Sequence, residues 1–186
     1  SSFNKLGILW DMAILDNILN PSSGTETYLK YFYIFNNVDG DNLTKQAVEI
    51  RWAKYFNLGN QFVLEFDVNA NVIEKKKLTE FEVYELGGAK SLRGFNENTF
   101  SGFRIGWSDI ELRYLFGRNS RLFAFGAYGY VENKQYKYND LFSFGFGLRT
   151  QTKIGILGID YGLGIQNREM RNPLDGIIHI GIETGL

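Results

Sequence analysis

One histidine, one serine and one aspartate are the residues through which this chain could hydrolyse a substrate. His179 is the only histidine, so any mechanism in which histidine activates a serine nucleophile must use it. Ser143 and Asp160 lie on the two strand-like segments that precede it. A polar interior without catalysis explains the three residues more simply, and we expect no enzyme. The chain has no cysteine, which excludes thiol chemistry, and nothing in it predicts a metal or cofactor.

Polar side chains recur at alternate positions along several segments. In residues 62–72 the even positions are apolar, and the odd positions are polar apart from Val63. A helix would scatter these polar residues around its circumference, whereas a strand places them on one face. The pattern therefore predicts a hydrated network inside a narrow barrel, without a specific ligand. Its predicted members are Glu65, Asp67, Arg149, Asp160 and Glu183.

The same period of two runs through most of the chain and defines the elements that must position these residues. Most of the segments reach the roughly 9–11 residues that cross a bilayer when a strand is tilted. Only every second residue of such a strand meets lipid, which explains why no run of about 18 apolar residues is needed. We predict nine strands, at about residues 3–16, 26–36, 46–57, 61–73, 102–116, 121–132, 141–151, 155–166 and 177–186.

The connections between these segments alternate in length. Short turns on one rim and long loops on the other are typical of bacterial outer-membrane barrels. We therefore predict an all-β fold in one domain, residues 1–186: a transmembrane antiparallel up-and-down β-barrel. Eight or nine of its strands are visible, and they form the whole barrel or part of one with about 16 strands. The predicted short turns are 58–60, 117–120 and 152–154, and the predicted long polar loops are 37–45, 74–101, 133–140 and 167–176.

Two features depart from a regular barrel. In residues 102–116 the apolar positions are first odd and then even, which predicts a β-bulge near Ser108 and Asp109 or a strand end outside the membrane. The number of strands is also odd, whereas bacterial single-chain barrels have even numbers. Either the first segment is not a full strand of the wall, or further strands belong upstream of it.

Four stretches carry a resemblance to a known family. The run GGAKSLRGF at 87–95 resembles the loop motif of the BamA-type outer-membrane assembly and translocation superfamily, also called bacterial surface antigens. Residues 144–162 look like that family's paired penultimate strands, and residues 178–182 look like its closing strand. Residues 15–24 look like one of its periplasmic turns. The four matches keep the family's order along nearly the whole chain.

The resemblance implies a role for the longest connection, the loop at about 74–101. In the family this loop folds back into the lumen, and the arginine of its motif docks on acidic residues of the wall. An arginine inside a lumen needs such a carboxylate, because an unpaired buried charge is costly. The docking residues implied here are Leu92, Arg93, Gly94, Phe95 and, as the carboxylate that binds Arg93 in a bidentate pair, Glu111.

The chain departs from the family at three points. The family's next strand often reads aromatic-x-Asp-x-Gly, but here Ala127 takes the acidic position, so the dock is either weaker or rebuilt. Leu186 stands where such barrels usually end in an aromatic residue. The sequence also lacks the periplasmic POTRA modules through which relatives recruit their clients.

These observations lead to a set of functional expectations. The resemblance implies a protein of the Gram-negative outer membrane that inserts other barrels or translocates polypeptides. The alternatives are the translocator barrel of a patatin-type autotransporter, a short structural barrel without insertase activity and, less favoured, a β-barrel lipid carrier. Expected partners are membrane lipid, lipopolysaccharide near Glu74–Lys77, client polypeptides and a second copy. The net charge of −1 gives no reason to expect nucleic acid.

Overall fold

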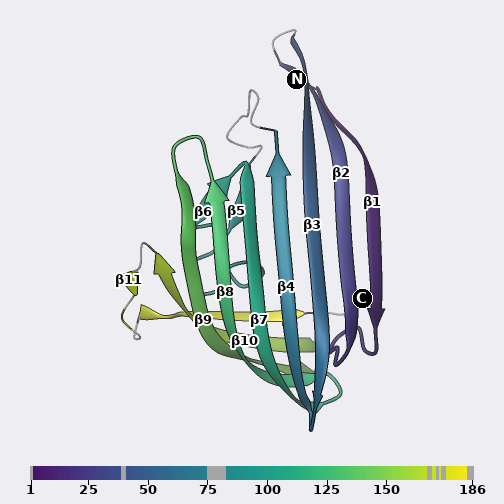
Figure 1. Ribbon diagram of the computed structural model, residues 1–186, viewed down its shortest axis with the longest axis vertical. Helices are drawn as coiled ribbons and strands as arrows, with labels where there is room; N and C mark the ends of the chain where they lie inside the picture. The colour runs from purple at the N-terminus through teal and green to yellow at the C-terminus, as the bar shows by residue number, and fades with distance from the viewer. Residues whose placement is uncertain are drawn as a thin grey trace.

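One large antiparallel sheet forms most of the computed structural model, which describes residues 2–38, 41–74, 83–166, 169–170, 172 and 175–183 (Figure 1). Its strands follow the order β1-β2-β3-β4-β7-β8-β9-β10, and β11 and β12 both pair with β10. A separate two-stranded sheet joins β5 and β6. None of the described residues forms a helix long and apolar enough to cross a membrane.

The strand bounds follow the alternating segments of the sequence. The first four strands are β1 (Ser2–Leu15), β2 (Gly24–Val38), β3 (Asp41–Gly59) and β4 (Phe62–Ile73). The small sheet consists of β5 (Tyr84–Leu86) and β6 (Phe100–Gly102). The large sheet continues with β7 (Arg104–Gly117), β8 (Ser120–Glu132), β9 (Lys137–Thr152), β10 (Gly155–Gln166), β11 (Glu169–Met170) and β12 (Ile177–Glu183).

The nine predicted strands are confirmed, because each coincides with one strand of the large sheet. The antiparallel arrangement is confirmed as well, through the register of every neighbouring pair. Within the described residues, β1 and β12 do not pair with each other, so the sheet is open. A closed barrel that crosses a membrane therefore stays a prediction.

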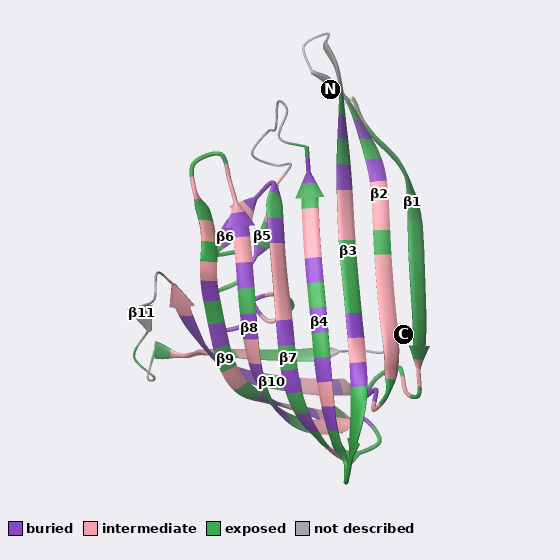
Figure 2. Cartoon of the chain, viewed as in Figure 1, coloured by how far each residue is buried: buried purple, intermediate pink, exposed green. Residues whose placement is uncertain are grey.

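Polarity alternates across the sheet as the sequence indicates. In β4 the odd residues Val63, Glu65, Asp67 and Asn69 are buried on one face, whereas the even residues are exposed or half-buried on the other. Figure 2 shows the resulting bands of alternating burial along β4, β7 and β8. The charged residues thus line the inner, concave face of the sheet.

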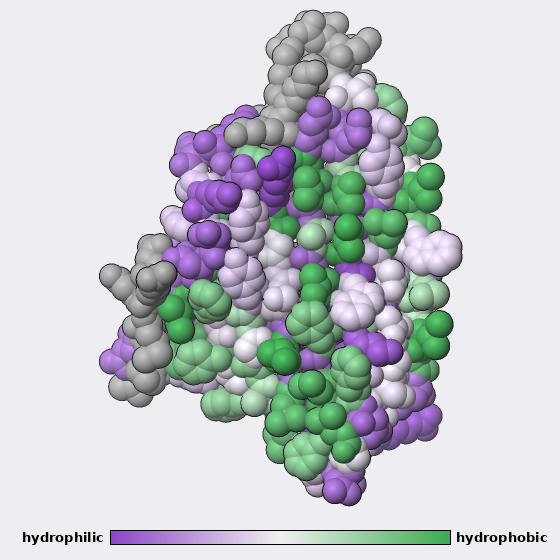
Figure 3. All heavy atoms as spheres, viewed as in Figure 1, coloured by the Kyte–Doolittle hydropathy of each residue, from purple (hydrophilic) through white to green (hydrophobic). Residues whose placement is uncertain are grey.

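The outer face is apolar over a wide area. Large side chains on it are exposed to a degree that is unusual for a soluble protein, and they reach 75 % exposed at Ile8. Figure 3 shows these apolar residues spread over the strands. Such a face needs a cover, and lipid is the cover that a barrel's outer band receives. Its members include Leu6, Trp10, Phe66, Ile110, Leu112, Phe144, Phe146 and Ile180.

The predicted bulge near Ser108 and Asp109 is wrong. The pairing of β7 with both neighbours is continuous through these residues, and its only irregularity lies between Leu115 and Gly117. Phe103 and Ile105 are buried on the same inward face as Asp109. Odd positions therefore face inward along the whole strand, and it is the apolar residues that change from the inner to the outer face. The inner face is apolar at one end of β7 because the loop packs against it there.

Two of the predicted long loops are shorter than expected, and three lie only partly within the described residues. β2 extends to Val38 and β3 starts at Asp41, so residues 37–45 mostly continue the hairpin. β9 already begins at Lys137, within the predicted loop 133–140. The loop 74–101 contains β5 and the start of β6, while Lys75, Lys76 and Lys77 lie outside the described part, as does Leu186.

A charge on the outer face tests whether lipid covers it. Phe144 lies near the middle of β9 and is 43 % exposed. We expect Phe144→Arg to make folding into lipid vesicles less favourable by about 2–4 kcal/mol, which is the cost of arginine at a bilayer midplane. Leu58→Arg, at the turn end of β3, should cost at most about 1 kcal/mol. Chaotrope unfolding in vesicles measures both values, and equal costs would place Phe144 outside a lipid belt.

Candidate functional site

The loop between β5 and β6 is folded against the inner face of the large sheet. Leu92 and Phe95 are almost completely buried there, and Phe95 packs edge-on against Phe100 with ring centroids 5.3 Å apart. The surrounding apolar cluster joins the loop to β7, β8 and β9. Its buried members are Leu86, Leu92, Phe95, Phe100, Ile105, Ala127, Val131 and Leu141. The motif is thus held inside the curve of the sheet rather than exposed.

Gly94 lets the loop backbone lie directly on β10. Its φ of +87° is in the left-handed region that favours glycine. A Cβ at Gly94 would come within 2.8 Å of the carbonyl carbon of Leu163, and a Cβ at Gly162 would come within 2.7 Å of the Gly94 nitrogen. Glycine is therefore required on both sides of this contact.

The arginine of the motif binds two carboxylates of β7. Arg93 Nη1 lies 2.6 Å from Glu111 Oε1, and Arg93 Nη2 donates to Asp109 Oδ1 at 2.9 Å. The guanidinium carbon also lies 3.9 Å from the ring centroid of Phe125 on β8. The structure brings Arg93 and Glu111 together, but the predicted bidentate pair is divided between Glu111 and Asp109.

Burial and charge act in opposite directions on Arg93. The side chain is only 6 % exposed, and this burial lowers its pKa. The nearby carboxylates of Glu111 and Asp109 outweigh burial and hold the pKa of Arg93 above its ordinary value. The guanidinium consequently stays charged, and the loop is fixed by a charged rather than a neutral contact.

Asp109 supplies the acid that the family pattern places at position 127. Asp109 and Ala127 are direct cross-strand partners of β7 and β8, so their Cβ atoms share the inner face. The dock is therefore rebuilt one strand away from the family position. Sequence reasoning did not assign Asp109 a role, although its spacing of two from Glu111 places both carboxylates on one face of a strand.

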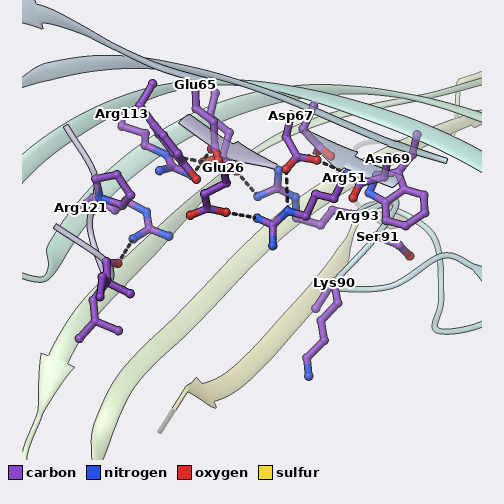
Figure 4. A pocket seen from close by; sticks show the side chains of 18 residues that line it. Glu26, Arg51, Glu65, Asp67, Asn69, Lys90, Ser91, Arg93, Arg113 and Arg121 are labelled. Atoms are coloured by element: carbon purple, nitrogen blue, oxygen red, sulfur yellow. Dashed lines mark hydrogen bonds and ion pairs between the residues drawn. The ribbon is translucent and has the colours of Figure 1, made fainter. Parts of the chain in front are cut away.

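The two carboxylates continue into a chain of charges across the inner face (Figure 4). Arg113 Nε donates to Glu111 Oε2 at 2.8 Å, and Arg113 also binds Glu65 on β4. Farther along β4, Asp67 accepts from Arg51 Nε at 3.1 Å. The predicted network members Glu65 and Asp67 thus lie in one layer with the loop arginine.

Arg149 and Asp160 form a separate pair on β9 and β10, joined by two contacts of 2.5 and 2.8 Å. This pair occupies both carboxylate oxygens of Asp160. His179 is the cross-strand neighbour of Asp160, and its Nδ1 lies 3.7 Å from Oε1 of Glu97 in the loop. The structure does not bring Ser143 to them, because Ser143 stands opposite Gly164, four residues along β10 from Asp160. The side chain of Glu183 lies outside the described residues.

The β1–β2 turn covers one end of this charged layer. Asn17 Nδ2 donates to the Arg118 carbonyl at 3.0 Å, and Asn20 Nδ2 donates to the Ser120 carbonyl at 3.3 Å. These bonds join segments about a hundred residues apart. Between this turn and the docked loop lies a cavity of about 650 Å³, lined by charged residues of the wall. We call it the lumen cavity. In the described part of the chain, no three acidic or histidine side chains are grouped to hold a metal.

The family model described as the Omp85 superfamily domain matches residues 2–183 of the chain. No curated protein matches it.

Removing either partner of the dock should destabilise the protein. Arg93→Ala leaves the buried Asp109 without its cation, so we expect a loss of about 3–5 kcal/mol. Glu111→Ala removes the anion that Arg93 and Arg113 share, but each arginine keeps one other carboxylate, so we expect a smaller loss of about 1–3 kcal/mol. The double variant should lose less than the sum. Arg104→Ala, which breaks an exposed pair with Glu132, is the control and should cost less than about 1 kcal/mol. Unfolding in detergent micelles gives all four values, and strict additivity would show that Arg93 and Glu111 act independently.

Moving the acid across the strands tests how the dock is rebuilt. Asp109→Ala should loosen the loop and expose residues 87–99 to protease, because Arg93 loses one of two carboxylates. Adding Ala127→Asp should restore protection, since the two positions face each other. Ala127→Asn in the same background has the same size without the charge and should not restore it. Equal protection by both substitutions would show that packing, not charge, holds the loop.

Proposed function

The chain belongs to the Omp85 superfamily, and we propose that it acts in the outer membrane of a Gram-negative bacterium, where it inserts other barrels or passes polypeptides across. The observation that carries this proposal is the loop docked on the inner face by Arg93, Asp109 and Glu111. A loop held this firmly makes one region of the wall rigid. The proposed function then depends on the parts of the sheet that this loop does not contact.

The outer face supports a membrane location. A charged inner face and an apolar outer face are the polarity of a barrel in lipid, and the reverse of a carrier that holds an apolar ligand inside water-soluble walls. Glu65 and Asp67 are buried on the inner face, whereas Phe66 and Val68, which alternate with them along β4, are exposed on the outer face. The lipid-carrier alternative would need the opposite assignment.

The free edge of β1 supports a role in handling polypeptides. Within the described residues no strand pairs with the outer edge of β1, and residues 4–14 are exposed on both faces. Unpaired backbone groups within a bilayer require a strand partner. The docked loop contacts β7, β8 and β10, so an incoming strand can pair with β1 without disturbing the dock.

Two narrower roles lie within the same family assignment. As the translocator barrel of a patatin-type autotransporter, the wall would carry a domain of its own polypeptide. As a short structural barrel, it would have no client, and the edge of β1 would be occupied permanently. The three roles differ in what contacts β1 while outer-membrane proteins are being synthesised. Only the proposed role requires that several different polypeptides contact it.

A photo-crosslinker on β1 tests the proposal. We expect Trp10→p-benzoylphenylalanine, placed in cells that are synthesising outer-membrane proteins, to give adducts with several barrel polypeptides. The matched position is Val68 on β4, which faces outward but pairs with strands on both sides and should give lipid adducts only. Adducts with one attached domain would favour the autotransporter role, and their absence at Trp10 would favour the structural role. A chain that is monodisperse in buffer without detergent would rule out the membrane location itself.

A further inference from the structure

The lumen cavity has charged residues on every side. The β1–β2 turn contributes Leu19 and Pro21 at one end, the docked loop contributes Lys90 and Ser91 at the other, and the wall strands lie between them (Figure 4). Its volume of about 650 Å³ is within the range of small-molecule sites. The charges that line it are not evenly paired.

Every carboxylate that lines the lumen cavity has an arginine partner. Three arginines of the wall and loop, Arg51, Arg93 and Arg113, account for all of these ion pairs. The pairs are Glu26–Arg51, Asp67–Arg51, Asp109–Arg93, Glu111–Arg93, Glu111–Arg113 and Glu65–Arg113. Two further cations line the same cavity, Arg121 and Lys90, and neither forms an ion pair with any residue that the structure describes.

Arg121 is held at the turn end of the cavity by neutral groups only. Its Nη1 donates to the Leu19 carbonyl and to Asn20 Oδ1, both at 3.3 Å, while its buried Nε has no acceptor among the described residues. Its cross-strand partner is another arginine, Arg149, which Asp160 already neutralises. Like charges directly opposite in a sheet repel each other. A half-buried guanidinium in this position lacks the anion that such a charge requires.

Lys90 offers a second cation from the opposite side. It lies two residues after the glycine pair of the loop and is exposed, and Figure 4 shows its amino group directed away from the cluster of charged side chains. Lysine binds phosphate as a mobile point charge, whereas arginine binds it in a fixed geometry. A cation fixed on the wall and a mobile cation on the loop therefore border the same solvent-filled space.

We propose that the lumen cavity binds a phosphate- or carboxylate-bearing anion at Arg121, with Lys90 at the loop end of the cavity as a more distant cation. Five carboxylates and five cations line the cavity, so the lining is positive only locally, at Arg121, which has no carboxylate within ion-pair distance among the described residues. Inorganic phosphate and the headgroup of an anionic lipid share this chemistry. Because the docked loop and the β1–β2 turn border the cavity, the bound anion joins the two segments that enclose it.

Trp107 lines the cavity and provides a direct readout. The chain has three tryptophans, and in the Trp10→Phe, Trp52→Phe background Trp107 is the only one left. We expect its fluorescence to change saturably with inorganic phosphate at constant ionic strength in a non-ionic detergent. Arg121→Gln should raise the midpoint about tenfold or more, the effect of losing a charged hydrogen bond. Lys90→Gln should raise it less.

Two further variants separate the charge from the fold. Arg121→Lys keeps the cation and should titrate close to the parent protein, and Arg118→Gln removes an exposed arginine of the adjacent turn and should change nothing. Equal midpoints for Arg121→Gln and the parent, an equal loss in Arg121→Lys, or no saturable response would each overturn the proposal. A parallel titration with short-chain phosphatidate identifies the source. A lower midpoint than phosphate indicates a lipid headgroup, and a higher midpoint indicates a free anion.

Discussion

The burial of one positive charge organises this protein. Arg93 is carried on a loop and is almost excluded from solvent, so carboxylates must meet it inside the sheet. Two carboxylates can do so from one strand only if they stand two residues apart on its inner face, as Asp109 and Glu111 do. That alternation sends Ile110 and Leu112 outward. The carboxylates that face inward to bind Arg93 therefore place the apolar residues that alternate with them on the outer face.

Small residues let the loop come close enough for the charges to meet. Gly94 rests on Gly162 and Gly164 of β10, where even a methyl group would approach the loop backbone too closely. Gly129 of β8 similarly leaves room for Leu92, because a Cβ there would lie 2.6 Å from Leu92 Cδ2. The glycines on the inner faces of these strands are therefore a fitted surface, and close packing adds dispersion contacts to the ionic dock.

Much of the fold could be predicted from the sequence because a period of two is a local property. The sequence also indicated the contact of Arg93 with Glu111, through the family motif. The sequence could not show whether Phe103 and Ile105 face inward or whether a bulge shifts the strand, since an inner face is apolar wherever another segment covers it. Asp109 was missed because the family pattern places the second acid on the following strand, at the position of Ala127, and not on the strand of Glu111. The hydrogen bonds of the β1–β2 turn to the β7–β8 turn join residues about a hundred positions apart, and no local sequence pattern predicts them.

The strength of the contacts is uneven across the sheet, and this unevenness links structure to function. Asp109, Arg93, Glu111, Arg113 and Glu65 form an unbroken row of alternating charges, so the loss of Arg93 or Arg113 leaves an end carboxylate, Asp109 or Glu65, without its ion pair inside the wall. Among the described residues, the edge strands carry no such row. There β1 pairs with β2 alone, and β12 pairs with β10 over seven residues. Deformation of the sheet is therefore least costly at its edges. A protein that accepts an incoming strand needs this distribution, with a rigid centre and edges that yield.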